Sequence, residues 1–177
     1  TGGMLDFNVT GGNTIIDGNI DNKALLNTSI IINNTKTLST TADNIAGQVN
    51  NNGTLALNGG ILNQQIIGNG TININAEVHS SADKFQGSGF INNASNLFFT
   101  DGTLEQVVSG NGNIVIGGLV QSSAAHLLNN VIVSDENALT LTGGTLSRVI
   151  NTTGQGKVVI DGHVSTAASN LLTDVSV

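Results

Sequence analysis

A long internal repeat is the feature of this sequence that most constrains its fold. The segment 58–99 aligns with the segment 100–141 without a gap, and a third copy, 142–177, begins at the same spacing but carries an insertion at Thr152–Thr153. The period of about 42 residues falls in the range typical of solenoids and propellers, in which each unit packs only against its neighbours. The sequence therefore predicts a single repeat-built domain over residues 1–177.

A shorter pattern lies inside this repeat: an apolar residue, any residue, a second apolar residue, and then a polar or small residue before glycine. Clear copies are LALNG at Leu55–Gly59 and VVIDG at Val158–Gly162. The step between copies is short from Leu57 to Ile74 and long from Ile74 to Phe99. This spacing predicts about eight coils that alternate between short turns of about 17 residues and long turns of about 25 residues. The second apolar positions of all copies, weak ones included, are Ile16, Thr40, Leu57, Ile74, Phe99, Ile116, Leu141 and Ile160.

The local pattern is that of short strands. Leu139–Thr142 alternates apolar and polar residues, and Asn-Gly pairs such as Asn52-Gly53 supply turn signals between such segments. Proline, which cannot donate to a β-ladder, is absent, whereas glycine occurs 23 times. A propeller would need four longer strands per repeat, and the shorter spacing inside the repeat disfavours it. We therefore predict an all-β parallel β-helix, or β-solenoid, with more than a third of its residues in short strands and almost no helix.

The same pattern predicts the core. Aromatic residues make up only 3% of the chain, so the core should be narrow and filled mainly by Leu, Ile and Val. The intervening Thr140 should be exposed. Positions one repeat apart, such as Leu62, Leu104 and Leu146, are expected to stack on one another as ladders. The residues expected to point inward are Leu55, Leu57, Ile72, Ile74, Leu97, Phe99, Ile114, Ile116, Leu139 and Leu141.

Composition excludes several classes of function. The net charge is −7, and the five basic residues are scattered, which argues against binding to nucleic acid or to an anionic membrane. No apolar run approaches the roughly 18 residues of a membrane-spanning helix, so no membrane insertion by this segment is expected. Cysteine is absent, so no disulfide or thiolate chemistry is available.

The candidate catalytic and metal-ligating residues do not form a motif. The histidines His79, His126 and His163 do not occupy equivalent positions of the repeat, and Asp135-Glu136 is the only adjacent acidic pair. Both features are typical of solvated surface positions. We therefore predict no catalytic residues, no metal site and no cofactor, although two carboxylates from different coils could still serve a glycosidase.

One segment recurs in the longer turns and is the candidate binding surface. It reads SSADKFQ at Ser80–Gln86, SSAAHLL at Ser122–Leu128 and STAASNLL at Ser165–Leu172. Such a segment is a loop or a short helical turn with Ser as its N-cap, and its Leu or Phe should pack against the coil. One interpretation is that it only covers apolar surface. The other is that its repetition builds a binding ridge from Ser80, Ser81, Ser122, Ser123 and His126.

The runs VNNNGTLALNGGIL at Val49–Leu62 and GNGTINI at Gly68–Ile74 resemble the passenger repeats of bacterial type V secretion proteins, the autotransporters and large surface adhesins. The resemblance extends over nearly the whole chain. It implies a right-handed parallel β-helix, displayed on the surface of a Gram-negative cell and anchored in the outer membrane through a C-terminal barrel that this sequence does not include. It also implies partners such as a host-cell receptor, matrix or other surface proteins. The alternation of short and long turns departs from the more even coils of many family members.

These observations support one main hypothesis and two alternatives. The main hypothesis is a structural stalk or presentation segment of an adhesin, without enzymatic activity, that mediates adhesion or coat formation. The alternatives are a polysaccharide-active enzyme fragment on the same fold and a phage or secreted fibre. Thr1 opens on the Gly2-Gly3 turn and Val177 falls in the middle of a repeat, without a cap sequence at either end. We therefore expect a piece of a longer stalk, or end-to-end association of copies.

Overall fold

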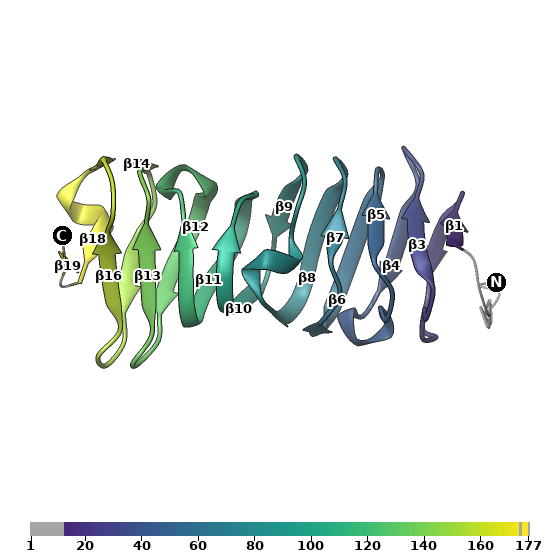
Figure 1. Ribbon diagram of the computed structural model, residues 1–177, viewed down its shortest axis with the longest axis horizontal. Coiled ribbons are helices and arrows are strands. Elements are labelled where there is room, and N and C mark those ends of the chain that lie inside the picture. The colour runs from purple at the N-terminus through teal and green to yellow at the C-terminus, as the bar shows by residue number, and fades with distance from the viewer. Residues whose placement is uncertain (1–12, 174, 177) are drawn as a thin grey trace.

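The computed structural model describes residues 13–173, 175 and 176 (Figure 1). Strands stacked side by side form an elongated rod, with β1 (Asn13–Ile16) at one end and β19 (Val175–Ser176) at the other (Figure 1). Every strand pair is parallel, as for Asn13–Ser29 and for Thr71–Phe90. More than half of the described residues lie in strands, and these residues contain no α-helix. The predicted all-β parallel solenoid is confirmed. The Gly2-Gly3 turn and Val177 lie outside the described residues.

Hydrogen bonds join the strands into three sheets. The four-stranded sheet contains β1 (Asn13–Ile16), β3 (Ser29–Ile32), β5 (Val49–Asn51) and β7 (Ile66–Ile67). The largest sheet contains β2 (Asn19–Asp21), β4 (Thr37–Thr40), β6 (Thr54–Leu62), β8 (Thr71–Ser80), β9 (Phe90–Asn93), β10 (Asn96–Leu104), β11 (Val107–Ser122), β12 (Leu127–Val133), β13 (Ala138–Leu141), β15 (Ile150–Thr152), β16 (Lys157–Ile160), β18 (Leu171–Leu172) and β19 (Val175–Ser176). The two-stranded sheet contains β14 (Gly144–Leu146) and β17 (Val164–Thr166). Four 3-10 helices lie at corners: η1 (Ala42–Asn44), η2 (Ala82–Lys84), η3 (Ala124–His126) and η4 (Ala168–Asn170).

Each coil has three sides, which we call A, B and C in chain order. The inward residues of side B form a continuous ladder through Ile20, Leu38, Leu55, Ile72, Ile91, Val108 and Leu127. Side C follows through Gly60, Val78, Leu97, Ile114, Val131, Ile150 and Leu171. Side A contains Ile30, Val49, Ile66 and Phe85, and further along the rod Leu104, Ser122, Leu141 and Ile160. Long strands bend around corners: β6 serves sides B and C, and β11 serves all three sides.

The predicted alternation of short and long coils is wrong. Residues paired between neighbouring coils lie from 16 positions apart, as for Asn13 and Ser29, to 21 positions apart, as for Ile150 and Leu171. The rod therefore contains about nine turns of similar length rather than about eight of two lengths. Ile74 stacks on Asn93, and not on Phe99 as the predicted long coil would require.

The physical reason is that the sequence repeat and the coil do not coincide. Gly60 pairs with Val78 and Val78 pairs with Leu97, so two coils lead from Gly60 to Leu97. The equivalent of Gly60 in the next repeat is Gly102, which lies beyond Leu97, past the next corner. Each repeat therefore covers two coils and about one third of another, and it places its strongest apolar pattern on the next side of the rod.

This shift also changes the expected ladders. Leu62, Leu104 and Leu146 are all buried, as their repeated pattern predicts. They stack on Ser80, Ser122 and Thr166 rather than on one another. The expectation that equivalent positions of the repeat form ladders is therefore wrong.

The core confirms the predicted strand phase. All ten residues expected to point inward are buried, from Leu55 to Leu141. Buried side chains form one cluster that continues along the rod from Ile16 to Val158. In the first two copies of the recurring segment the predicted apolar contact is confirmed, because Phe85 and Leu127 are buried in this cluster. In the third copy Leu171 is only partly buried against the cluster and Leu172 is exposed.

Two buried asparagines one repeat apart link successive coils. The Asn51 side chain donates from Nδ2 to the Thr71 carbonyl (2.9 Å) and accepts at Oδ1 from the Gly53 N–H (3.2 Å). Asn93 makes the equivalent bonds to the Asn113 carbonyl and the Ser95 N–H. Buried amides are tolerated here because these backbone groups satisfy them.

The Leu141 side chain provides a test of the strand phase. Leu141→Ala should lower the free energy of unfolding by about 2–5 kcal/mol, because it leaves a cavity in the narrow core. Thr140→Ala on the neighbouring, partly exposed position should change it by about 0.5 kcal/mol or less. Chemical denaturation of the two variants checks both values. Similar losses for both would show that the inward and outward positions are assigned incorrectly.

Candidate functional site

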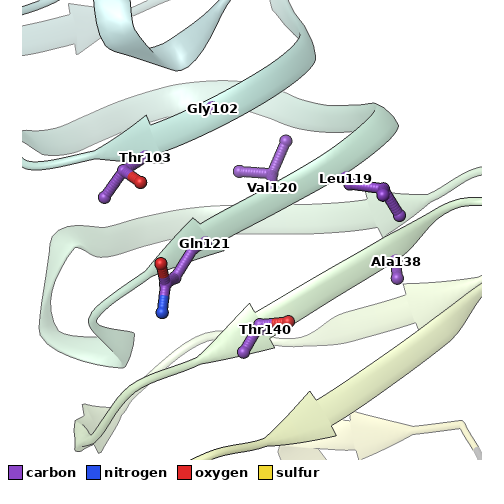
Figure 2. Close-up of a pocket in the computed structure, with 7 residues that line it drawn as sticks. All are labelled: Gly102, Thr103, Leu119, Val120, Gln121, Ala138 and Thr140. Atoms are coloured by element: carbon purple, nitrogen blue, oxygen red, sulfur yellow. The ribbon is translucent and has the colours of Figure 1, made fainter.

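A shallow hollow on side A is the candidate functional site. It has a volume of about 380 Å³ and lies where β10, β11 and β13 run side by side (Figure 2). Apart from Leu119, the outward residues that line the hollow are small or polar, and they lie over a buried apolar layer that includes Val120. Its lining residues are Gly102, Thr103, Leu119, Val120, Gln121, Ala138 and Thr140.

The outward side chains form two neighbouring ladders across the hollow. Thr103, Gln121 and Thr140 are aligned by the strand register, and their side chains have no hydrogen-bond partner in the described part of the chain. The second ladder runs from Asp101 through Leu119 and Ala138 to Lys157. Leu119 is 73% exposed, which makes it the most exposed large apolar residue among those described. The arrangement offers polar groups at intervals of about 4.8 Å beside an apolar contact.

The residues of the predicted binding ridge do not share a single surface. Ser80 and Ser81 lie at a corner between sides C and A, whereas Ser122, Ser123 and His126 lie at a corner between sides A and B. The cause is the same shift of one third of a coil per repeat. Each recurring segment therefore faces a different direction, so the five residues do not form one continuous ridge. Contact between any one of them and a partner stays a prediction.

The ridge serines also have structural partners. Ser80 and Ser122 are buried, and their hydroxyls donate to the carbonyls of Leu62 and Leu104. Ser81 and Ser123 are N-caps, as the sequence suggested, and their hydroxyls accept from backbone N–H groups two residues later. The His126 ring contacts the Leu104 carbonyl through Nδ1 at 3.2 Å. The bonds of Ser80, Ser122 and His126 join the corners to neighbouring coils, while the N-cap bonds hold each corner in shape. These roles explain why the segment recurs.

Three exposed carboxylates bond to the backbone of the following coil. Asp43 Oδ1 accepts from the Ile61 N–H at 3.0 Å, and Asp83 Oδ1 accepts from the Thr103 N–H at 2.8 Å. Asp135, one half of the acidic pair noted in the sequence, accepts from the Gln155 N–H at 2.6 Å. In the following coil a glycine lies beside each carboxylate, at a position where a Cβ atom would overlap the carboxylate. The acid and the glycine therefore recur together. These carboxylates have a structural role.

A small cluster of polar and aromatic side chains lies on side C. His79 Nε2 is 3.0 Å from Glu77 Oε1, and the His79 ring stacks on Phe98 with a centroid distance of 4.4 Å and an interplanar angle of 5°. His163 is exposed and lies outside this cluster. The residues that the structure describes contain no group of three or more His, Cys, Asp or Glu side chains arranged to hold a metal ion.

The hydrogen bond from His79 lowers the pKa of the Glu77 carboxyl below its ordinary value of 4.5, against an opposing effect of desolvation, with a further lowering by Asn96. A carboxyl whose pKa is lower in the folded state adds stability at pH values above its unfolded pKa. That contribution should be lost as the pH falls through the folded value. NMR titration should show a Glu77 pKa below 4.5, and His79→Ala should move it back toward that value. An unchanged Glu77 titration in the variant would contradict the assignment.

Sequence reasoning did not identify the hollow or the side C cluster. The available signal was the presence of large apolar residues at outward positions of the strands, as at Ile61, Phe98 and Leu119. Neighbours across coils could not be assigned without the register, so these residues could not be grouped.

Among the described residues, no helix is both long and apolar enough to span a membrane. Comparison with protein-family models, with curated proteins and with solved structures finds no match for this chain. We therefore infer the function from the geometry of the rod and from its sequence pattern.

Proposed function

We propose that this chain is a structural stalk or presentation segment of a bacterial cell-surface autotransporter or adhesin. The observation that carries the proposal is the single core that continues through the rod from Ile16 to Val158. At about 4.8 Å per coil, about nine turns extend over roughly 43 Å. Such a rod can hold a binding surface at a distance from the cell.

The polar groups of the rod support this role. Asn51, Asn93, Asp43, Asp83 and Asp135 bond to backbone groups of another coil, so they resist separation of the coils. The sequence resemblance supports the setting: an extracellular location, anchorage in the outer membrane through a C-terminal barrel, and adhesion to a host-cell receptor, matrix or other surface proteins. End-to-end association of copies is part of the same proposal. No enzymatic activity, cofactor or nucleic-acid partner is part of the proposal.

The proposal is tested by measuring shape, binding and polysaccharide cleavage on the same purified chain. Small-angle scattering should show an elongated particle, and the chain should bind to cultured host cells or immobilised matrix proteins in a saturable manner. Viscosity and reducing-end assays on acidic and neutral polysaccharides should show no cleavage. Depolymerisation of a polysaccharide would contradict the stalk and favour the enzyme alternative.

A second candidate function is the binding of a neutral polysaccharide in the hollow on side A. The observation that favours it is the aligned, unpartnered ladder of Thr103, Gln121 and Thr140 beside the exposed Leu119, among the residues that the structure describes. Gln121→Ala should weaken such binding in calorimetric titration with neutral oligosaccharides, whereas Gln155→Ala, at an exposed position in the turn between β15 and β16, should not. Equal affinities for the two variants would remove this candidate.

A further inference from the structure

The outward face of side C carries a ladder that differs from the rest of the polar surface. We call it the side C ladder, and its members are Ile61, His79, Phe98, Val115, Ile132, Asn151 and Leu172. Each member is paired in register with the next, so the ladder crosses successive coils without a gap. Ile61 is 52% exposed and Leu172 is 58% exposed, while the inner apolar members are half-buried by their neighbours in the sheet. A continuous, mainly apolar strip on a surface marks an interaction site.

The order of chemical types along the ladder is the same in both directions. From either end it reads apolar, polar, apolar, apolar, apolar, polar, apolar, with Val115 at the centre. A two-fold axis that passes Val115 would place Ile61 against Leu172, Phe98 against Ile132, and each polar member against the other. This is the self-complementarity that an isologous interface between two identical chains requires.

Charge fixes the relative orientation of the two copies. Glu77 lies two residues before His79, and Arg148 lies three residues before Asn151, each two coils from Val115 and near the same edge of the ladder. The Arg148 Nε donates to the Leu128 carbonyl at 3.1 Å, which holds the guanidinium at this edge. Both are exposed. Between them this edge carries the amides of Asn96, Asn113 and Asn130, which are aligned in register.

The alignment of these charges depends on the direction of the second rod. When the two-fold axis lies in the plane of the interface and perpendicular to the rods, the two rods are antiparallel. Each Glu77 then faces the Arg148 of the other copy. With parallel rods, Glu77 would face the opposite edge, where Thr100 and Ser134 are followed by the exposed carboxylates of Asp101 and Asp135. Opposite charges therefore favour the antiparallel arrangement.

We propose that a second copy of this chain packs on the side C ladder, face to face and antiparallel, with the two-fold axis at Val115. The apolar members provide the buried contact, and the two Glu77–Arg148 pairs select the antiparallel arrangement. This lateral pairing goes beyond the proposed stalk, because it would join rods that project from opposing surfaces. It is also distinct from end-to-end association, which leaves side C free.

The first experiment measures the dimer by sedimentation over a concentration series. The wild-type chain should form a concentration-dependent dimer, and Val115→Lys should raise its dissociation constant about tenfold or more, because two like charges would meet at the axis. The control is Val159→Lys, which makes the same change at a half-buried outward position on side A and should leave the dimer unchanged. Circular dichroism confirms that both variants fold. A chain that stays monomeric throughout, or equal effects of the two variants, would overturn the proposal.

The second experiment tests the orientation by cross-linking, since the chain contains no cysteine. Val115→Cys alone should form a disulfide-linked dimer under mild oxidation. Phe98→Cys should cross-link when mixed with Ile132→Cys but not with itself. Efficient self-cross-linking of Phe98→Cys would overturn the antiparallel arrangement. If the chain forms no dimer and a different protein binds this face, the ladder has another occupant, and the proposal is equally overturned.

Discussion

Replacing Gly118 by Ala is expected to destabilise the rod by about 3 kcal/mol or more. A Cβ atom at this position would overlap the carbonyl oxygen of Thr100 and lie 2.6 Å from its carbonyl carbon. Both atoms belong to the backbone of the preceding coil, so no side-chain rotation can relieve the overlap. The two coils must move apart, which disrupts the backbone hydrogen bonds between β10 and β11.

The adjacent glycine provides the control for this prediction. A Cβ atom at Gly117 would have its nearest contact at 3.7 Å, to the Phe99 carbonyl oxygen, which is an ordinary contact distance. Gly117→Ala should therefore change the free energy of unfolding by about 1 kcal/mol or less. Denaturant titration of both variants gives the comparison. If Gly118→Ala is as stable as Gly117→Ala, the close approach of these two coils is wrong.

Replacing Phe99 by Ala is expected to cost about 3–5 kcal/mol. Phe99 is fully buried, and its ring meets that of Phe85 edge to face with a centroid distance of 5.9 Å and an interplanar angle of 78°. The core around it is filled mainly by aliphatic side chains, which are too small to occupy the cavity that a lost ring leaves. The loss should therefore lie near the upper end of the range for buried side chains.

The neighbouring Phe98 distinguishes loss of core packing from loss of any phenyl ring. Phe98 points outward from the same strand, where it stacks on His79 and stays partly exposed. Phe98→Ala should cost about 1 kcal/mol, measured at a protein concentration low enough to exclude dimers. A larger loss at Phe98 than at Phe99 would mean that β10 presents the opposite face to the core.

The sequence was sufficient to predict the class of fold and the phase of the strands. The alternation in segments such as Leu139–Thr142 assigns inward and outward positions locally, and Leu139 and Leu141 are buried as expected. The length of the coil could not be read in the same way. An apolar-x-apolar pattern marks an inward-facing strand on any of the three sides, so the step from Ile74 to Phe99 was counted as one long coil. In the structure this step is one coil, from Ile74 to Asn93, followed by a move to the next strand.

The same ambiguity explains why the residues of the predicted binding ridge lie at different corners. Ser80 and Ser122 recur at a fixed sequence spacing, which suggested a shared surface, but the spacing is not a whole number of coils. Their recurrence reflects the hydrogen bonds that each corner needs. Conversely, Ile61, Phe98 and Leu172 are unevenly spaced in the sequence, and only the register brings them onto one ladder.

The most direct test of the coil register uses pairs of introduced cysteines on side B. Asn73 and Asn92 are aligned in neighbouring coils, with Asn92 Nδ2 donating to Asn73 Oδ1 at 3.3 Å. Asn73→Cys combined with Asn92→Cys should therefore form an intramolecular disulfide, because aligned residues of adjacent strands lie about 5 Å apart at Cα, within the range that a disulfide spans. Asn73→Cys combined with Phe98→Cys, the pair that the long coil expected from the sequence would align, should stay reduced under the same conditions. The opposite result would contradict a solenoid whose coils are all of similar length.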